Sequence, residues 1–507
     1  MASPARAWAR TGKRWLHLCH RWLGIVTGLF FATWFVSGVV MMYVAYPALT
    51  EPERRAGLPT IAWDAVQISP DAALAGETRF PEALSLSMQG AEPVYRIVRW
   101  DGSRRAVSAV DGRAIGPATP TEALAIAGHD PRSRHPSFRE TIARDLWTVH
   151  QRYDRVRPLH RIALGDADGT DLYVSEPTGA IVLDTTRHER FWNWFGAVPH
   201  WLYLTPLRAK AELWRTVILW ISGVAMVSGI SGFALGLVRL RLARRYPSGA
   251  VTPYRGLARW HHVGGLVGGL ALMSFIVSGW LSMNPNRWFS STAPSQQMLD
   301  RYADAPGARA GLDLASIRGQ ACADAAEVRF TWLGGAPLAL VACGDGREIA
   351  CCNAAPDMPA RIATAARRLI PEAGSMVVAR LDHEDFYWTS HHRQRRLPVL
   401  RVAFDDPAAT WLHIDPATGE ILNRLDRSGR VERWGFALLH TLDLGPLVRH
   451  RPAWDGLMLL LLAAGSVIAA SGVAMGWRRL RRPSAGSRAA LSLSAGALPA
   501  RPGSPTS

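Results

Sequence analysis

The stretch RFWNWFGAVPHWLYLTPLRAKAELW, residues 190–214, returns in altered form as RVERWGFALLHTLDLGPLVRHRPAW, residues 430–454. The copies align without a gap at an offset of 240, so His200 corresponds to His440. The positions that are identical in the two copies include, in the first copy, Arg190, Trp194, His200, Leu202, Leu204, Pro206, Leu207 and Trp214. An internal repeat indicates the architecture of a chain, because each copy is expected to fold as the same unit.

A second histidine is repeated at the start of an apolar stretch. The residues His20, Gly24, Gly28, Ser37 and Gly38 recur at an offset of 241 as His261, Gly265, Gly269, Ser278 and Gly279. His20, Gly24, Thr27 and Phe31 follow steps of three to four residues, so they share one side of a helix. Glycines at this spacing allow either a second helix or a flat ligand to approach the backbone.

Four apolar runs free of acidic and basic residues set the fold class. They are Leu23–Tyr46, Val217–Val238, Val263–Met283 and Leu457–Trp477. Each is close to the roughly 20 residues that a helix needs to cross a bilayer. The first run is long for a secretory signal and has a copy in the third run, so we expect it to be retained. The sequence predicts a membrane α-helical protein with a four-helix transmembrane core built from two parallel repeats.

Basic residues predict the orientation of these helices. The 507-residue chain carries a net charge of +17, and its arginines and lysines cluster before the first run, between the second and third, and after the fourth. Such segments stay in the cytoplasm. The expected order is therefore a cytoplasmic N-terminus (1–22), helices at 23–46, 213–238, 260–283 and 455–477, external α+β domains at 47–212 and 284–454, a cytoplasmic loop (239–259) and a disordered cytoplasmic tail (478–507). The bases flank helices next to membrane lipid, so a nucleic-acid partner is not expected.

The external segments contain strand and cysteine signals. Asp171–Leu183 and Thr410–Leu422 each predict a β-hairpin, with Gly179 and Gly419 in the turn where a positive φ is needed. Cys322, Cys343, Cys351 and Cys352 all fall in the second segment, where an oxidising compartment permits disulfides. Four cysteines allow three connectivities, and the sequence leaves the choice open.

The repeated histidines are the candidate site. Neutral imidazole remains a ligand of haem iron in both redox states. His20 and His261 both begin their helices, which predicts a common depth, and His200 and His440 both precede a helix that runs inward. The alternatives are His17 or His262 for the first pair, and His150 or His391 for the second. The competing interpretation is a set of interfacial histidines hydrogen-bonded in a helix bundle.

Other histidines and other chemistries receive less support. His160, His383 and His413 have no histidine at the repeated position, so we expect them to be surface or core residues. The chain lacks a Walker phosphate loop, a dinucleotide fingerprint and a zinc-binding His-Glu-x-x-His motif. Electrons would therefore come from a cytoplasmic partner or from membrane quinol.

At these residues the chain resembles the PepSY-associated transmembrane helix family of bacterial iron-regulated inner-membrane proteins. The matching motifs are His20-Arg21-Trp22-Leu23-Gly24, Pro199-His200-Trp201-Leu202-Tyr203, Trp260-His261-His262 and Leu439-His440-Thr441-Leu442-Asp443. The resemblance implies a multi-pass inner-membrane protein with two periplasmic PepSY-like domains. Some members are ferric-siderophore reductases that bind two b-type haems through histidines.

The resemblance and the residues together predict a haem-b oxidoreductase of the inner membrane. His20 and His261 would hold a cytoplasmic-side haem b, and His200 and His440 a periplasmic-side haem b. Electrons would pass outward to a periplasmic ferric chelate, such as a ferric siderophore. The alternative is a non-redox, membrane-anchored PepSY module that binds a periplasmic protein or protease. A metal or siderophore transporter is weakened by the lack of charged residues inside the four runs.

Overall fold

A computed structural model describes residues 4–351, 357–390 and 395–481 of the chain. The chain divides into two compact units, each assembled from separated stretches. Unit 1 falls within Met1–Val36, Trp220–Val277 and Gly456–Ser507, and unit 2 within Ser37–Leu219 and Ser278–Asp455. Residues 478–480 of the predicted tail (478–507) instead belong to a helix that ends at Leu480, and residues 482–507 lie outside the described residues.

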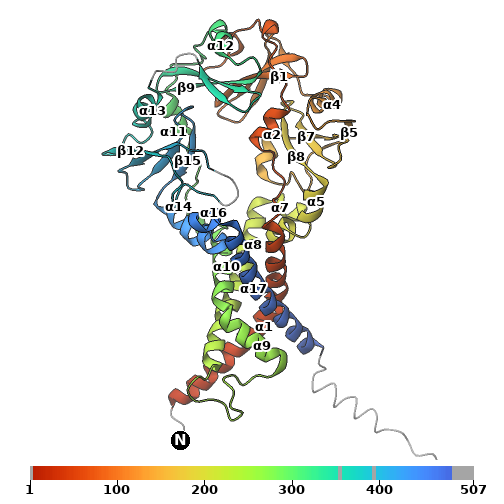
Figure 1. The fold of residues 1–507 in the computed structure, drawn as a ribbon, viewed down its shortest axis with the longest axis vertical. Coiled ribbons are helices and arrows are strands. Elements are labelled where there is room, and N and C mark those ends of the chain that lie inside the picture. Colours follow the sequence, from red (N-terminus) through yellow and green to blue (C-terminus); the bar gives the residue numbers. More distant parts are fainter. Residues whose placement is uncertain (1–3, 352–356, 391–394, 482–507) are drawn as a thin grey trace, which may run out of the picture. The chain divides into compact units, whose positions relative to one another are not determined.

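The apolar runs form long helices. Three described helices are long and apolar enough to cross a membrane, namely α1 (Pro4–Met41), α8 (Ala211–Arg239) and α17 (Arg451–Leu480) (Figure 1). A fourth span exists if the bent pair α9 (Gly256–Val267) and α10 (Gly269–Leu281) crosses as one. Helix α1 ends at Met41, before the predicted limit at Tyr46, and Tyr46 itself precedes Pro47, which biases it towards an extended backbone.

The third apolar run is bent where the sequence predicted one helix over 260–283. Helices α9 and α10 meet at Gly268 with an angle of 65°. A Cβ at this position would lie 3.1 Å from Ile468 Cδ1 and 3.3 Å from Ala464 Cβ, so glycine permits close packing against α17. In α1 the position equivalent to Gly268 is Thr27, and the helix is unbroken there. The bend thus coincides with the doubled glycines of the second copy, Gly264-Gly265 and Gly268-Gly269, and glycines are a known cause of sharp kinks.

The two external segments share one antiparallel sheet, which the sequence analysis did not predict. The first segment supplies β1 (Ala83–Gln89), β2 (Glu92–Val98), β3 (Arg104–Ser108) and β4 (Ala114–Ile115). The second supplies β9 (Ala325–Leu333), β10 (Ala336–Cys343) and β11 (Glu348–Cys351). The strand order is β11-β10-β9-β1-β2-β3-β4, and β1 pairs directly with β9 (Figure 1). Side chains of both segments form one core, in which Leu86 and Val328 are fully buried.

Each external segment also forms a four-stranded antiparallel sheet of its own. The first contains β5 (Ser137–Ile142), β6 (Leu159–Ala163), β7 (Asp171–Ser175) and β8 (Ile181–Thr185), packed with α4 (Pro120–Gly128). The second contains β12 (Met376–Leu381), β13 (Val399–Phe404), β14 (Trp411–Ile414) and β15 (Ile421–Leu425), packed with α13 (Met358–Ala366). The predicted hairpins are confirmed as β7–β8 and β14–β15, with φ of 61° at Gly179 and 73° at Gly419.

Shorter helices connect these parts of the chain. They are α2 (Glu51–Ala56), α3 (Pro70–Ala73), α5 (Arg187–Asn193), α6 (Ala197–Trp201), α7 (Thr205–Arg208), α11 (Gln296–Ala303), α12 (Leu314–Gln320), α14 (Arg427–Glu432), α15 (Leu439–Thr441) and α16 (Gly445–Arg449). Three 3₁₀ turns span Trp63–Ala65, Gln151–Val156 and Pro285–Arg287, and a π-helical turn spans Arg433–Leu438.

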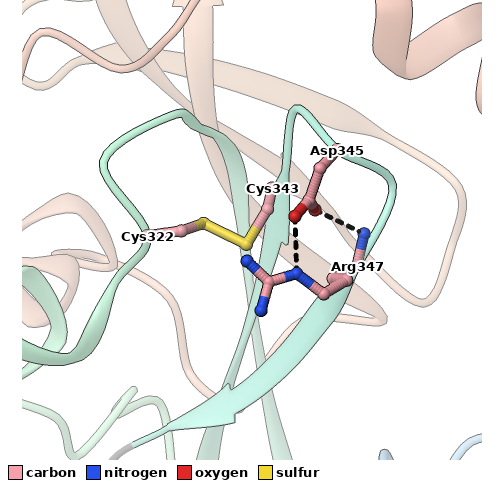
Figure 2. Close-up of a disulfide and its surroundings, with 4 residues drawn as sticks. All are labelled: Cys322, Cys343, Asp345 and Arg347. Atoms are coloured by element: carbon pink, nitrogen blue, oxygen red, sulfur yellow. Dashed lines mark hydrogen bonds and ion pairs between the residues drawn. A yellow bond between two sulfur atoms is a disulfide. The ribbon is translucent and has the colours of Figure 1, made fainter.

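One disulfide cross-links the second external segment. Cys322 is joined to Cys343 at the end of β10, beside an ion pair between Asp345 and Arg347 (Figure 2). Of the three connectivities that the sequence left open, the structure therefore has the one in which Cys322 pairs with Cys343. Cys351 is buried on β11, and Cys352 lies outside the described residues.

Replacement of both Cys322 and Cys343 by serine removes a cross-link between residues separated by 21 positions. The unfolded chain gains freedom, so we expect the free energy of unfolding to fall by roughly 3 kcal/mol. Thermal unfolding of the detergent-solubilised protein, followed by near-UV circular dichroism, measures this loss. Under reducing conditions the unfolding curve of the wild type should match that of the double variant. A wild-type unfolding curve that is the same with and without reductant would contradict the assigned disulfide.

Candidate haem-binding site

His200 and His440 occupy equivalent turns of unit 2. His200 lies on α6 and His440 on α15, and the leucine that follows each helix has a left-handed backbone, with φ of 51° at Leu202 and 49° at Leu442. Leucine rarely adopts this conformation, so the surrounding structure must hold it. The repeated tryptophans contribute directly. Trp214 donates its indole N–H to the carbonyl after His200 at 2.8 Å, and Trp454 does the same after His440 at 2.9 Å.

The rings of His200 and His440 lie close together, and a serine contacts each of them. Their centroids are 6.2 Å apart, with 77° between the ring planes. Ser37 Oγ on α1 shares a hydrogen bond of 2.9 Å with His200 Nδ1, and Ser278 Oγ on α10 shares one of 3.0 Å with His440 Nδ1. Both serines are buried. The repeated Ser-Gly motifs therefore orient the imidazoles, and a metal ion would be bound through Nε2.

His20 and His261 form an equivalent pair in unit 1. Their ring centroids are also 6.2 Å apart, with 31° between the planes. His20 Nδ1 lies 3.1 Å from the carbonyl of Ser228 on α8, and His261 Nδ1 lies 2.9 Å from Ser471 Oγ on α17. Ser471 and its repeat counterpart Ser231 each donate to a carbonyl one turn earlier in their helix. As in unit 2, Nε2 of each ring is the nitrogen that would bind a metal.

Glycines leave space for the rings of His20 and His261. A Cβ on Gly232 would lie 2.7 Å from His20 Nδ1, which is inside the contact distance. A Cβ on Gly472, the residue 240 positions later, would lie 3.3 Å from His261 Cε1. Any larger residue at position 232 would displace the imidazole.

One Ser-Gly pair therefore serves each repeated histidine. The pairs are Ser37-Gly38 for His200, Ser278-Gly279 for His440, Ser231-Gly232 for His20 and Ser471-Gly472 for His261. The sequence analysis noted the first two but missed Ser231-Gly232 and Ser471-Gly472. They were detectable, because the offset of 240 continues from the repeated external segments into the second and fourth apolar runs.

The ring separation fits a metal ion held between two imidazoles. Metal–imidazole nitrogen distances are about 2.0–2.1 Å, and a ring centroid lies roughly 1.1 Å beyond its nitrogen, so two opposed ligands place their centroids about 6.3 Å apart. A direct hydrogen bond of about 2.9 Å between two ring nitrogens would bring the centroids to about 5 Å. Both pairs, at 6.2 Å, match the first arrangement.

An apolar cavity adjoins His20 and His261. Its volume is about 330 Å³, within the range of small-molecule sites. Ile25, Phe31, Phe233, Leu272 and Ile468 contribute apolar surface, and Gly24, Gly28, Gly265 and Gly269 lie along the wall. The repeated glycines of α1 and of the bent pair thus line a cavity that the histidines also line. The paired histidines and the apolar lining are residue types that would hold a haem.

The alternative histidines have different surroundings. His262 Nε2 lies 3.0 Å from the Gly236 carbonyl and its ring packs against Tyr254, whereas His17 lines the cavity beside His20. His150 begins a 3₁₀ turn, where its Nδ1 accepts a hydrogen bond from the Arg152 backbone N–H. His391 lies outside the described residues. Among the described histidines, only the repeated ones form pairs with ring centroids 6.2 Å apart.

The unmatched histidines are core and surface residues, as predicted. His160 is buried and bonds both Thr141 Oγ1 and the Ala118 carbonyl. His413 is fully buried, stacks on Trp388 at 4.6 Å and accepts a hydrogen bond from Arg401. His383 is exposed.

Arg208 has a structural role on a buried part of the chain. It is only 4% exposed, donates to Gln151 and packs over the Trp214 ring at 4.5 Å. Arg395 packs over Trp388 and Arg396 pairs with Asp415. Cys322, Asp324 and Cys343 lie close enough together to hold a metal ion. The two cysteines instead form the disulfide, so they are not thiolate ligands.

Comparison with known proteins adds no assignment. No protein-family model matches the chain, and no curated protein sequence matches it.

The core position of His413 predicts a pH dependence of stability. Burial, reinforced by the Arg401 and Arg395 guanidinium groups and opposed by Asp385, lowers the pKa of His413 from 6.5 to about 3. The unfolded state therefore binds a proton that the folded state excludes below pH 6.5, and stability is lost as the pH falls from 6.5 towards 3. We expect this residue to contribute a loss of about 1.4 kcal/mol per pH unit in that window.

The contribution is measured as the difference between wild type and His413→Gln, whose amide oxygen still accepts from Arg401. The free energy of unfolding of the variant should fall less steeply between pH 6.5 and pH 5. His383→Gln is the exposed control and should follow the wild type. Equal pH slopes for wild type and His413→Gln would show that His413 is accessible to protons.

Proposed function

We propose that this protein is a haem-b oxidoreductase of the bacterial inner membrane that passes electrons to a periplasmic ferric chelate. The observation that carries the proposal is the pair of repeated imidazole sites, each with ring centroids 6.2 Å apart. Both separations agree with the roughly 6.3 Å expected for two imidazoles that bind one metal ion, and they exceed the roughly 5 Å expected for two hydrogen-bonded imidazoles. The resemblance to the PepSY-associated transmembrane helix family supports the same cofactor.

His20 and His261 would hold one haem b, and His200 and His440 the other. Haem supplies one-electron chemistry when bound, with a potential that depends on axial ligands, burial and nearby charge. The chain's own contribution is positional. Each Nδ1 has a hydrogen-bond partner here, which is a backbone carbonyl for His20 and a serine hydroxyl for the other three histidines. This bond orients the ring and favours the tautomer in which Nε2 can bind a metal.

The proposed direction of electron transfer rests on the order of the elements. His20 and His261 begin their apolar segments, next to the basic flanks that we assign to the cytoplasm. His200 and His440 precede α8 and α17 and follow the external segments. A cytoplasmic donor or membrane quinol would therefore reduce the first site, and the second would reduce the periplasmic acceptor. Reduction weakens the hold of hard oxygen ligands on iron, which releases it from a ferric siderophore.

The alternative, a non-redox module that binds a periplasmic protein, draws on two exposed edge strands. β5 and β12 are the terminal strands of their four-stranded sheets and are exposed along most of their length. Exposed edges can accept an extended segment of a partner. This alternative leaves the paired histidines without a role, so we favour the redox proposal.

Alanine substitution of single histidines tests the proposed ligand pairs. His20→Ala and His261→Ala should each remove the same haem, and His200→Ala and His440→Ala the other, because loss of one axial ligand abolishes that site. The measurement is the dithionite-reduced minus oxidised spectrum of purified protein, with haem content per chain. His383→Ala is the control and should keep both haems. Partial loss of both haems in every variant would refute the pairing, and colourless wild-type protein from haem-replete cells would refute the function.

The glycine that accommodates His20 provides a second test without changing a ligand. Gly232→Ala places a methyl group 2.7 Å from His20 Nδ1, so the ring must move and the haem at His20 and His261 should be lost. The haem at His200 and His440 should remain. The matched control is Gly456→Ala, another helical glycine, whose Cβ meets nothing within 4 Å. Retention of both haems by Gly232→Ala would contradict the ring position on which the site depends.

A further inference from the structure

The cavity beside His20 and His261 has a polar part that the histidine ligands do not explain. Arg21 and Arg479 are among its lining residues, together with Tyr254. None of the residues that line the cavity is an aspartate or a glutamate. The cavity therefore combines an apolar wall with two cations and has no lining acid to neutralise them.

Both arginines lack a carboxylate partner within the described part of the chain. No described aspartate or glutamate lies within ion-pair distance of Arg21 or Arg479, although many arginines of unit 2 form such pairs. Arg21 is half-buried, and its Nε is buried without a hydrogen-bond partner in the protein. Arg479 is exposed where it borders the cavity. The Arg21 guanidinium carbon lies 5.3 Å from the centre of the Trp22 ring, a contact that leaves the charge without an anion. A half-buried guanidinium group without an anionic partner is unfavourable, so an anion in the cavity would stabilise it.

Both side chains are placed by the elements that form the histidine site. Arg21 directly follows His20 on α1. Arg479 lies two helical turns after Gly472 on α17, on the same face as the glycine that accommodates His261. The repeat counterpart of Arg21 is His262, which lines the same cavity and bonds a backbone carbonyl. The counterpart of Arg479 is Arg239, which is also an arginine but does not line the cavity. Arg21 and Arg479 are therefore the arginines that line this cavity.

We propose that Arg21 and Arg479 bind the two propionate carboxylates of the haem held by His20 and His261. The inference rests on the proposed function and extends it to the recognition of the cofactor's acidic edge. Guanidinium groups match carboxylates in both charge and geometry, and such pairs are stronger than neutral hydrogen bonds. The apolar wall accommodates the macrocycle, and the two arginines select a porphyrin with two free acids.

The test compares haem with its dimethyl ester, which has the same iron and macrocycle but no carboxylates. Full-length protein carrying His200→Ala and His440→Ala, produced in haem-deficient cells, is titrated with each compound while the Soret band is recorded. This double-alanine protein should bind haem more tightly than the ester, by about tenfold or more for each arginine–carboxylate contact that the ester cannot make. Adding Arg21→Gln and Arg479→Gln should weaken haem binding and remove the preference, whereas Arg478→Gln, a neighbouring residue that does not line the cavity, should retain it.

The possible outcomes separate this inference from the function on which it rests. Equal affinity of the starting protein for haem and ester, with a normal bis-histidine spectrum, overturns the role of the arginines and leaves the haem site intact. A preference that survives in the double glutamine variant overturns it in the same way. No Soret band with either compound overturns both proposals. Arg21→Lys with Arg479→Lys should keep part of the preference, which guards against misfolding of the glutamine variant.

Discussion

The hydrogen bond at Nδ1 of each repeated histidine is the interaction on which the candidate site depends. An imidazole among apolar helices is unfavourable unless its polar atoms are satisfied, and here a serine or a backbone carbonyl satisfies one nitrogen of each ring. That bond also orients the ring and determines which nitrogen would bind a metal. Gly232, Gly279 and Gly472 lie against the rings of His20, His440 and His261, and the approach is closest at Gly232. A ligand site thus arises from a dipeptide repeated on each apolar segment.

Duplication also shapes the external segments, although in a different way. Each segment forms one four-stranded sheet of its own, and the two sheets correspond at the offset of 240. The seven-stranded sheet contains strands of both segments, which meet where β1 pairs with β9. Its core draws side chains from both segments, so neither half of this sheet can bury its apolar face alone. The shared sheet ties the two copies together within unit 2, where His200 and His440 lie.

Much of this arrangement could be predicted from the sequence. The rest depends on contacts between residues far apart in sequence, which only the structure shows. Apolar runs predicted long helices, and glycine in a turn between two strand-like runs predicted both hairpins, because these signals are local. Pairing of β1 with β9 joins residues far apart in sequence, and no local pattern encodes it. The same holds for Ser228, whose backbone carbonyl has no sequence signature. The bend at Gly268 was partly foreseeable from the doubled glycines, although the sequence analysis predicted one helix over 260–283.

Density between the paired imidazoles is the most direct test of the central claim. A cryo-electron microscopy map of the wild-type protein, purified from haem-replete cells, would show what separates the ring of His20 from that of His261, and the ring of His200 from that of His440. The account predicts a flat macrocycle with central metal density in both places, with Nε2 of every ring directed at the metal. Rings that close on one another, with water or lipid between the helices, would contradict it.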